Sequence, residues 1–291
     1  GYSVIIQGSH FQWEFVKSMP DNYVPGVPAE DAQHLKNVTT KIVNQLEHKY
    51  NCKLGDKTVI GTSFGALATL FLADNEYHKY TLNITKYISI CPPIDLLYAM
   101  KQIDKNGEDW HKNTDNLQQR VAQTASKIIQ LSDLKNEKSN LNINKLPFTE
   151  DEGKLITGFI MHQKLSDVIF TLENTPKNKQ TNIYTQINNM NYKDYVEKYL
   201  LSKYSLEDFG EKVSLLSLED FFRNNNNYKI YHSLDDYLTN QSQLKKLKIY
   251  TGQNTTILSN GSHLGFLYTK EFLNDLKNEI KLTDKTALNR N

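Results

Sequence analysis

The chain has 291 residues, of which 38% are hydrophobic and 23% are charged, and its formal net charge is +1. A chain of this length can bury a large core, either as one domain or as a domain with a sizeable insertion. The nearly balanced charge provides no basic field for nucleic acid and no acidic field for a cationic partner. No stretch approaches the 18 consecutive apolar residues typical of a membrane span.

The cysteines and the first residues leave the cellular compartment open. Cys52 and Cys91 form no CxxC pair and have no nearby histidine at a spacing typical of a metal site, so we expect two free thiols, with a disulfide as the alternative. The chain begins inside a predicted strand, without an initiator methionine or a signal sequence. An upstream segment, a signal peptide included, could therefore precede it, and the cytoplasm is the favoured location.

The first hundred residues alternate short apolar runs with longer amphipathic ones. Residues 3–8 (SVIIQG) are expected to form a buried strand, and the apolar positions within 29–50 fall at helical spacing. Strands are then predicted at 57–61 and 86–91, with an apolar helix over 63–76 between them. This alternation is typical of βαβ units and of a mostly parallel α/β sheet.

The pattern changes after the Pro92-Pro93 pair. Residues 94–226 contain predicted helices at 117–134, 150–173 and 190–204 but no convincing buried strand. Strands at 228–233 and 254–259, each followed by a predicted helix, then resume the α/β pattern. We therefore predict a core of residues 1–93 and 227–291, interrupted by a helical cap of residues 94–226. Such a cap is expected to cover the carboxyl ends of the strands, where α/β sheets bind ligands.

The sharpest local signal is GTSFG at residues 61–65, a G-x-S-x-G between a strand and a helix. A one-turn reversal from strand to helix strains the backbone of Ser63, and flanking glycines leave room for it. The hydroxyl then projects at the edge of the sheet, beside a helix N-terminus that stabilises negative charge. We interpret Ser63 as a nucleophile; the alternative is that the glycines only pack the helix against the strand.

A serine hydroxyl needs a base to accept its proton. His263 lies in the loop after the last predicted strand, with a glycine on each side, and is our candidate; a capping or loop histidine is the alternative. Asp236, in the loop after the strand at 228–233, is our candidate for the acid that orients the imidazole. Asp235 and Asp95 remain rivals, since both also follow predicted strands.

Three motifs, GTSFG, HSLDDYL and GSHLGF, resemble those of the α/β-hydrolase family, and the resemblance covers residues 1–93 and 227–282. It favours Asp236 within the LDD turn, and the chain order serine, acid, histidine agrees with that family. The family's first antiparallel strands are not found, so N-terminal strands are expected to be missing. The resemblance also implies an oxyanion hole made by the amides of Phe64 and, after the predicted first strand, Ser9. His10 could line that hole or pack among aromatic side chains.

The resemblance implies transfer of an acyl group to water, with no metal or organic cofactor. Ester cleavage, as in an esterase or lipase, is our first choice because it is the commonest activity on such a scaffold. A serine peptidase is the first alternative, favoured if a cap carboxylate such as Glu150, Asp151 or Glu152 holds a substrate amine. The second is a binding protein without catalysis. The partner is then a small ester or a peptide; the oligomeric state stays open.

Substrate selection is assigned to the cap, whose apolar positions could form an acyl pocket or simply pack the cap together. These positions are Ile128, Ile129, Leu131, Ile156, Phe159, Ile160, Val168, Ile169 and Phe170.

Overall fold

The computed structural model describes residues 3–112, 117–136, 149–173 and 180–288. In this part of the chain, four strands form one parallel sheet in the order β1-β2-β3-β4. Their bounds are Lys57–Thr62, Ile84–Ile90, Tyr228–Ser233 and Thr255–Leu258. The expected α/β architecture is confirmed at this level. Because all four strands run the same way, the loops that follow them meet at one edge of the sheet.

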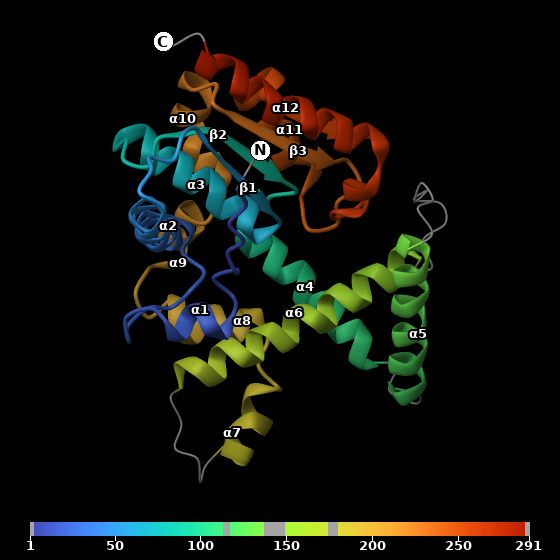
Figure 1. Cartoon of the computed structure of the whole chain (residues 1–291). Coiled ribbons are helices and arrows are strands. Elements are labelled where there is room, and N and C mark those ends of the chain that lie inside the picture. The colour runs from blue at the N-terminus through green and yellow to red at the C-terminus, as the bar shows by residue number, and fades with distance from the viewer. Residues whose placement is uncertain (1–2, 113–116, 137–148, 174–179, 289–291) are drawn as a thin grey trace.

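Helices cover both faces of the sheet (Figure 1). On one face, Tyr87 and Ile230 pack with α2 (Pro28–Tyr50), α3 (Phe64–His78) and α11 (Gln241–Thr251). On the other, Ile88 and Tyr231 pack with residues of α12 (Lys270–Leu288). This alternation of neighbouring residues between the two faces is what a strand buried on both sides requires.

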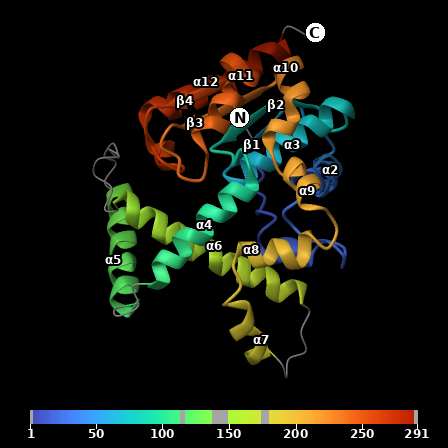
Figure 2. The ribbon, with the colours of Figure 1, turned by 180° about the vertical axis from the view of Figure 1, so that it is seen from behind.

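Helices also make up most of the described parts of residues 96–224 (Figures 1 and 2). They are α4 (Leu96–Lys112), α5 (Leu117–Asn136), α6 (Glu150–Leu172), α7 (Gln180–Ile187), α8 (Tyr192–Tyr195) with a π-helical continuation (Val196–Leu200), α9 (Leu206–Lys212) and α10 (Glu219–Asn224). Two glycines allow α4 and α6 to cross closely, since a Cβ on Gly158 would lie 2.5 Å from the amide nitrogen of Gly107.

The helical segment of residues 96–213 leaves the α/β core and rejoins it at one place. The Leu215 amide donates to the Ile94 carbonyl at 2.8 Å, and the Leu96 amide donates to the Val213 carbonyl at 3.2 Å. Residues 96–213 are therefore tied together at their two ends. The chain that follows returns to the core, where Phe221 is fully buried against α3 and β3 residues.

The prediction of a buried strand at residues 3–8 is wrong. These residues have no strand partner, and Val4 and Ile6 are 79% and 93% exposed. A run of β-branched side chains provides strand propensity, but a strand exists only where a neighbour completes its hydrogen bonds. A short helix that was not predicted, α1 (Trp13–Lys17), follows this segment. None of the helices in the described parts of the chain is long and apolar enough to cross a membrane.

Candidate active site

Ser63 occupies the turn between β1 and α3 with φ 52° and ψ −123°, a conformation that is costly for a residue with a side chain. Its amide donates to the Ile90 carbonyl at 2.9 Å, which ties the turn to the neighbouring strand. Gly61 permits the approach of helix to strand, because a Cβ there would lie 2.2 Å from the Gly65 carbonyl oxygen. The tight strand-to-helix turn predicted from GTSFG is thus present.

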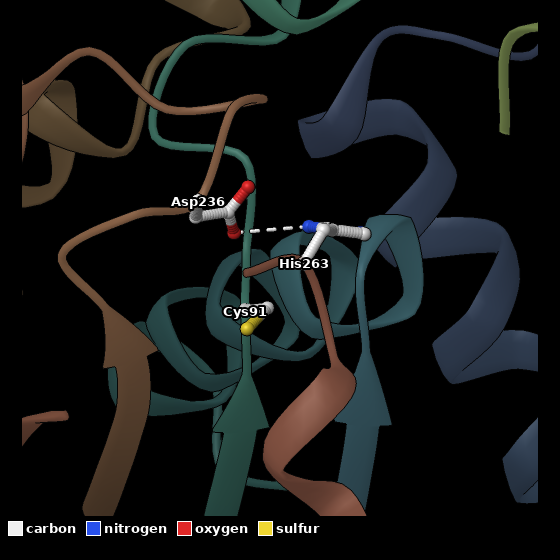
Figure 3. Close-up of side chains that lie close together, drawn as sticks. All are labelled: Cys91, Asp236 and His263. Carbon is white, nitrogen blue, oxygen red and sulfur yellow. Dashed lines mark hydrogen bonds and ion pairs between the residues drawn. The ribbon is translucent and has the colours of Figure 1, made fainter. Parts of the chain in front are cut away.

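A series of hydrogen bonds joins the three predicted site residues. His263 Nε2 lies 2.9 Å from Ser63 Oγ, and His263 Nδ1 lies 2.9 Å from Asp236 Oδ2. Asp236 follows β3 and His263 follows β4, so the parallel sheet brings both to the edge where Ser63 stands. Figure 3 shows the hydrogen bond that joins Asp236 to His263. Because a carboxylate only accepts hydrogen bonds, Nδ1–H donates to Asp236 and Nε2 is free to accept the serine proton.

Asp236 is buried, and its side chain is nevertheless a carboxylate anion. Burial raises the pKa of this carboxyl, but the charge of His263 and its hydrogen bond outweigh burial, so the pKa is lowered overall. The Leu238 amide also donates to Oδ1 at 2.9 Å. A buried carboxylate with these partners can stabilise the positive charge that His263 acquires on taking a proton.

The two other candidates for the acid, Asp235 and Asp95, accept hydrogen bonds from groups other than His263. Asp235 accepts hydrogen bonds from the amides of Gly261 and Ser262, at 3.1 and 2.8 Å, and so holds the loop that carries His263. Asp95 accepts from the Tyr98 amide at 3.0 Å and from Gln243 Nε2 at 3.0 Å, at the start of α4. Asp236 is therefore the carboxylate that accepts the hydrogen bond of His263, and Asp235 accepts from the backbone amides of the same loop.

His232 is a site residue that the sequence interpretation missed. Its Nδ1 accepts from the Ser233 amide at 3.0 Å and its Nε2 donates to the Pro92 carbonyl at 3.2 Å, which joins the ends of β3 and β2. Burial lowers its pKa, so the ring is neutral beside Asp236, whose Oδ2 lies 3.8 Å away. The only signal in the sequence was its place at the start of HSLDDYL.

The two residues whose amides are expected to form an oxyanion hole, Phe64 and Ser9, both line the cavity at Ser63. Phe64 is the first residue of α3, where the amide has no acceptor within the helix. Ser9 lines the same cavity as Ser63 and Phe64, in a tight turn closed by the Gln12 amide on the Ser9 carbonyl at 3.0 Å. The role of either amide in an oxyanion hole stays a prediction.

His10 both lines this cavity and packs among aromatic rings. Its ring centre lies 4.6 Å from that of Phe15 and 5.8 Å from that of Phe64. Its Nε2 donates to the Asp31 carbonyl at 2.9 Å. Burial lowers its pKa to about 4, so the ring is neutral near neutral pH. His10 therefore anchors the Ser9 turn to α2.

The Asp31 side chain extends this anchor. Its carboxyl accepts from the Tyr23 hydroxyl at 2.6 Å and from the Gly26 amide at 2.9 Å, and it is fully buried. Burial raises its pKa to about 7, although the hydrogen bonds from Tyr23 and Gly26 oppose the shift.

This shift predicts a pH-dependent difference between the wild type and Asp31→Asn. The unfolded chain releases the Asp31 proton near pH 3.8, whereas the folded chain holds it to about pH 7. Between these values the folded state binds more protons, so the wild type's free energy of unfolding, relative to the variant's, should fall as pH rises. Urea unfolding from pH 3.5 to 8 measures it. A difference that stays flat or rises over this range contradicts the assignment.

A cavity of about 2100 Å³ opens at Ser63 and His263 and also runs along the outer edge of β1. On the side of the helical segment, the wall of the cavity is formed by α4, α6 and the start of α8. The wall residues are Leu96, Ala99, Met100, Ile103, Thr157, Ile160, Met161, Lys164 and Tyr192. Most of them are apolar, and the two methionines can adapt to the shape of an apolar ligand.

The apolar cap positions named from the sequence divide into groups. Val168 and Ile169 are fully buried in the core, and Ile160 lines the cavity. Ile129 is 62% exposed on α5. Ile156 and Phe159 are half-buried and outside the cavity wall, and Phe170 packs on Tyr184 with ring centres 4.7 Å apart. The side chains of Ile128 and Leu131 lie outside the described residues.

Two of the three cap carboxylates that would favour a peptidase, Asp151 and Glu152, have described side chains, and neither lines this cavity. Glu152 is paired with Lys127 and closes a capping box with Thr149 at the start of α6. Asp151 lies 3.7 Å from Lys154 Nζ, and the Glu150 side chain lies outside the described residues.

The chain is thus an α/β protein with a serine, a histidine and an aspartate in hydrogen-bonded series at the carboxyl edge of a parallel sheet. No family model matches it, and no curated protein or solved structure shows detectable similarity to it. The hydrogen-bonded series of these three side chains is therefore the main indication of what the protein does.

Proposed function

We propose that the protein is a serine hydrolase of the α/β-hydrolase type that cleaves a carboxylic ester through an acyl-enzyme on Ser63. The observation that carries this proposal is the pair of 2.9 Å contacts from Ser63 Oγ to His263 Nε2 and from His263 Nδ1 to Asp236 Oδ2. The left-handed backbone of Ser63 supports it, since strain of this kind persists where it serves a function. Residues 94–226 would then form the cap over the site.

The reaction proceeds in two halves. Ser63 Oγ attacks the ester carbonyl while His263 Nε2 takes its proton, and the amides of Phe64 and Ser9 stabilise the oxyanion. His263 then gives the proton to the leaving alcohol, which departs and leaves the acyl group on Ser63. Water then attacks this ester while His263 Nε2 takes its proton; as the bond from Ser63 Oγ to the acyl carbon breaks, His263 gives that proton to Oγ and the acid is released. Asp236 keeps Nδ1 protonated and stabilises the charged imidazole throughout.

An ester with an apolar acyl group fits the cavity better than a peptide with a free amine. The part of its wall formed by α4 and α6 is mainly apolar, and its charged member, Lys164, is a cation. Among the described side chains of α4 and α6 that line the cavity, no carboxylate would pair a substrate ammonium, whereas an acyl chain placed there would be removed from water. This contrast favours the esterase over the peptidase.

Labelling with a fluorophosphonate probe tests the proposal. The probe should modify native wild-type protein on Ser63 and leave Ser63→Ala unlabelled, and p-nitrophenyl butyrate should be cleaved much faster than aminoacyl p-nitroanilides. Equal labelling of Ser63→Ala, or none of the folded wild type, would remove the enzyme hypothesis and favour a binding protein. Faster cleavage of the anilides would favour the peptidase.

Ile160→Trp is expected to shorten the preferred acyl chain. Ile160 lies on α6 in the cavity wall and is 43% exposed, so an indole there fills space that a long acyl chain would occupy. The ratio of kcat/KM for p-nitrophenyl octanoate to that for the acetate should fall roughly tenfold or more. Ile129→Trp, on the exposed side of α5, is the control and should leave the ratio unchanged. An unchanged ratio in folded Ile160→Trp would place the acyl site elsewhere.

A further inference from the structure

A thiol lies beside the acid and the base of the proposed active site. Cys91 follows β2 with φ 49°, an unusual backbone for a residue with a side chain, and its amide donates to the Tyr231 carbonyl at 2.8 Å. One ligand atom each from Cys91, Asp236 and His263 lies within 4.8 Å of the others. Figure 3 shows Cys91 beneath the Asp236–His263 pair, at the end of the neighbouring strand. Three parallel strands thus bring together three residues that are distant in the sequence.

These ligands suit a thiophilic divalent cation. Zn²⁺ binds thiolate sulfur, imidazole nitrogen and carboxylate oxygen at roughly 2.0–2.3 Å, so tetrahedral ligand atoms stand roughly 3.3–3.8 Å apart. In this structure the distance from His263 Nδ1 to Asp236 Oδ2 is 2.9 Å, and the three ligand atoms lie within 4.8 Å of one another. The spacing around a tetrahedral ion falls between these two distances, so shifts of the side chains by about 1 Å or less would bring all three atoms to coordinating distance. A thiolate and a carboxylate together balance the charge of a divalent ion, which removes the main cost of burying it.

We propose that Cys91, Asp236 and His263 form a site for Zn²⁺ or a similar thiophilic divalent cation, and that its occupation switches the hydrolase off. The binding follows from the ligand geometry alone. Its effect on turnover rests on the function proposed above.

The inhibition follows from the position of one proton. In the metal-free site His263 Nδ1–H donates to Asp236, and Nε2 accepts from Ser63. A metal ion on Nδ1 needs its lone pair, so the single imidazole proton must lie on Nε2. Nε2 then has no lone pair for the serine proton, and Ser63 loses its base. The Cys91 thiol gives up its proton to solvent, so binding of one ion releases one proton.

The resting state of Cys91 is compatible with catalysis. The thiol is fully buried, and burial first, then the Asp236 charge, raises its pKa well above the ordinary range. It is therefore protonated and unreactive without the ion, unlike an exposed cysteine with a lowered pKa. His263 lines the cavity, so an ion can approach from the substrate side.

Metal titration of wild type, Cys91→Ala and Cys52→Ala tests the site, with Cys52 as the matched control because it is the exposed cysteine. Each variant's hydrolysis of p-nitrophenyl butyrate is measured against Zn²⁺ and compared with its own metal-free rate. Wild type and Cys52→Ala should bind one Zn²⁺ in equilibrium dialysis and lose activity together. Cys91→Ala should need on the order of a hundredfold more Zn²⁺ for half-inhibition, since it lacks a direct ligand.

Co²⁺ provides a readout that does not depend on activity or on the folding of Cys91→Ala. Wild type loaded with Co²⁺ should show thiolate-to-cobalt charge-transfer absorption, and Cys52→Ala should show the same band. Absence of this band, or equal Zn²⁺ inhibition of Cys91→Ala and wild type, overturns the proposal. If the band appears but the fluorophosphonate fails to label metal-free wild type, the metal site stands and the hydrolase function fails.

Discussion

Asp236→Asn is expected to lower kcat by roughly 10⁴-fold with little change in KM. The Asp236 carboxylate accepts the Nδ1–H of His263 at 2.9 Å in a buried place. An asparagine there is neutral and can present its own N–H to the ring, which places the imidazole proton on Nε2. That tautomer cannot take the serine proton, although the packing around the site is kept. Steady-state hydrolysis of p-nitrophenyl butyrate measures the loss.

The two neighbouring candidates provide matched controls. Asp235→Asn can still accept one of the two amide hydrogen bonds of the His263 loop, so its cost should be about 1–2 kcal/mol, or roughly tenfold in rate. Asp95→Asn, at the start of α4, should leave kcat nearly unchanged. If Asp235→Asn were as impaired as Asp236→Asn, the assignment of the acid would be wrong.

Gly61→Ala is expected to destabilise the fold by about 3 kcal/mol or more. Its Cβ would lie 2.2 Å from the Gly65 carbonyl oxygen and 2.4 Å from Thr69 Oγ1, and the first of these is backbone that cannot rotate away. Either α3 must move off β1 or the Ser63 turn must open. The midpoint of urea unfolding should fall markedly, and fluorophosphonate labelling of the remaining folded protein should slow.

Gly65→Ala is the matched control, because a Cβ at this second glycine of the motif meets no atom within 4 Å. Gly65 lies in the first turn of α3, where alanine costs less conformational entropy than glycine. We expect stability to be unchanged or to rise by up to about 1 kcal/mol. Equal destabilisation by the two substitutions would show that the close contact of β1 with α3 does not explain the motif.

Local sequence was sufficient where neighbouring residues determine structure. The strand at 228–233 and the helix starting near residue 29 are present as predicted, because period and propensity act within one element. The GTSFG turn was predictable for the same reason: its glycines relieve crowding between residues only four positions apart. Residues 3–8 show the limit of such reasoning, because strand propensity cannot supply the neighbouring strand that this segment lacks.

The choice among candidate partners required the tertiary structure. Asp235 and Asp236 are adjacent in one loop, and only the position of His263, 27 residues beyond Asp236, distinguishes their roles. Nothing near Cys91 in the sequence indicates a metal ligand, yet the parallel order of β2, β3 and β4 sets its sulfur beside Asp236 and His263. The sequence by itself thus determined the strained strand-to-helix turn at Ser63, because short-range sterics produce it. Which side chains surround that turn was decided by pairing between distant strands, which no local pattern encodes.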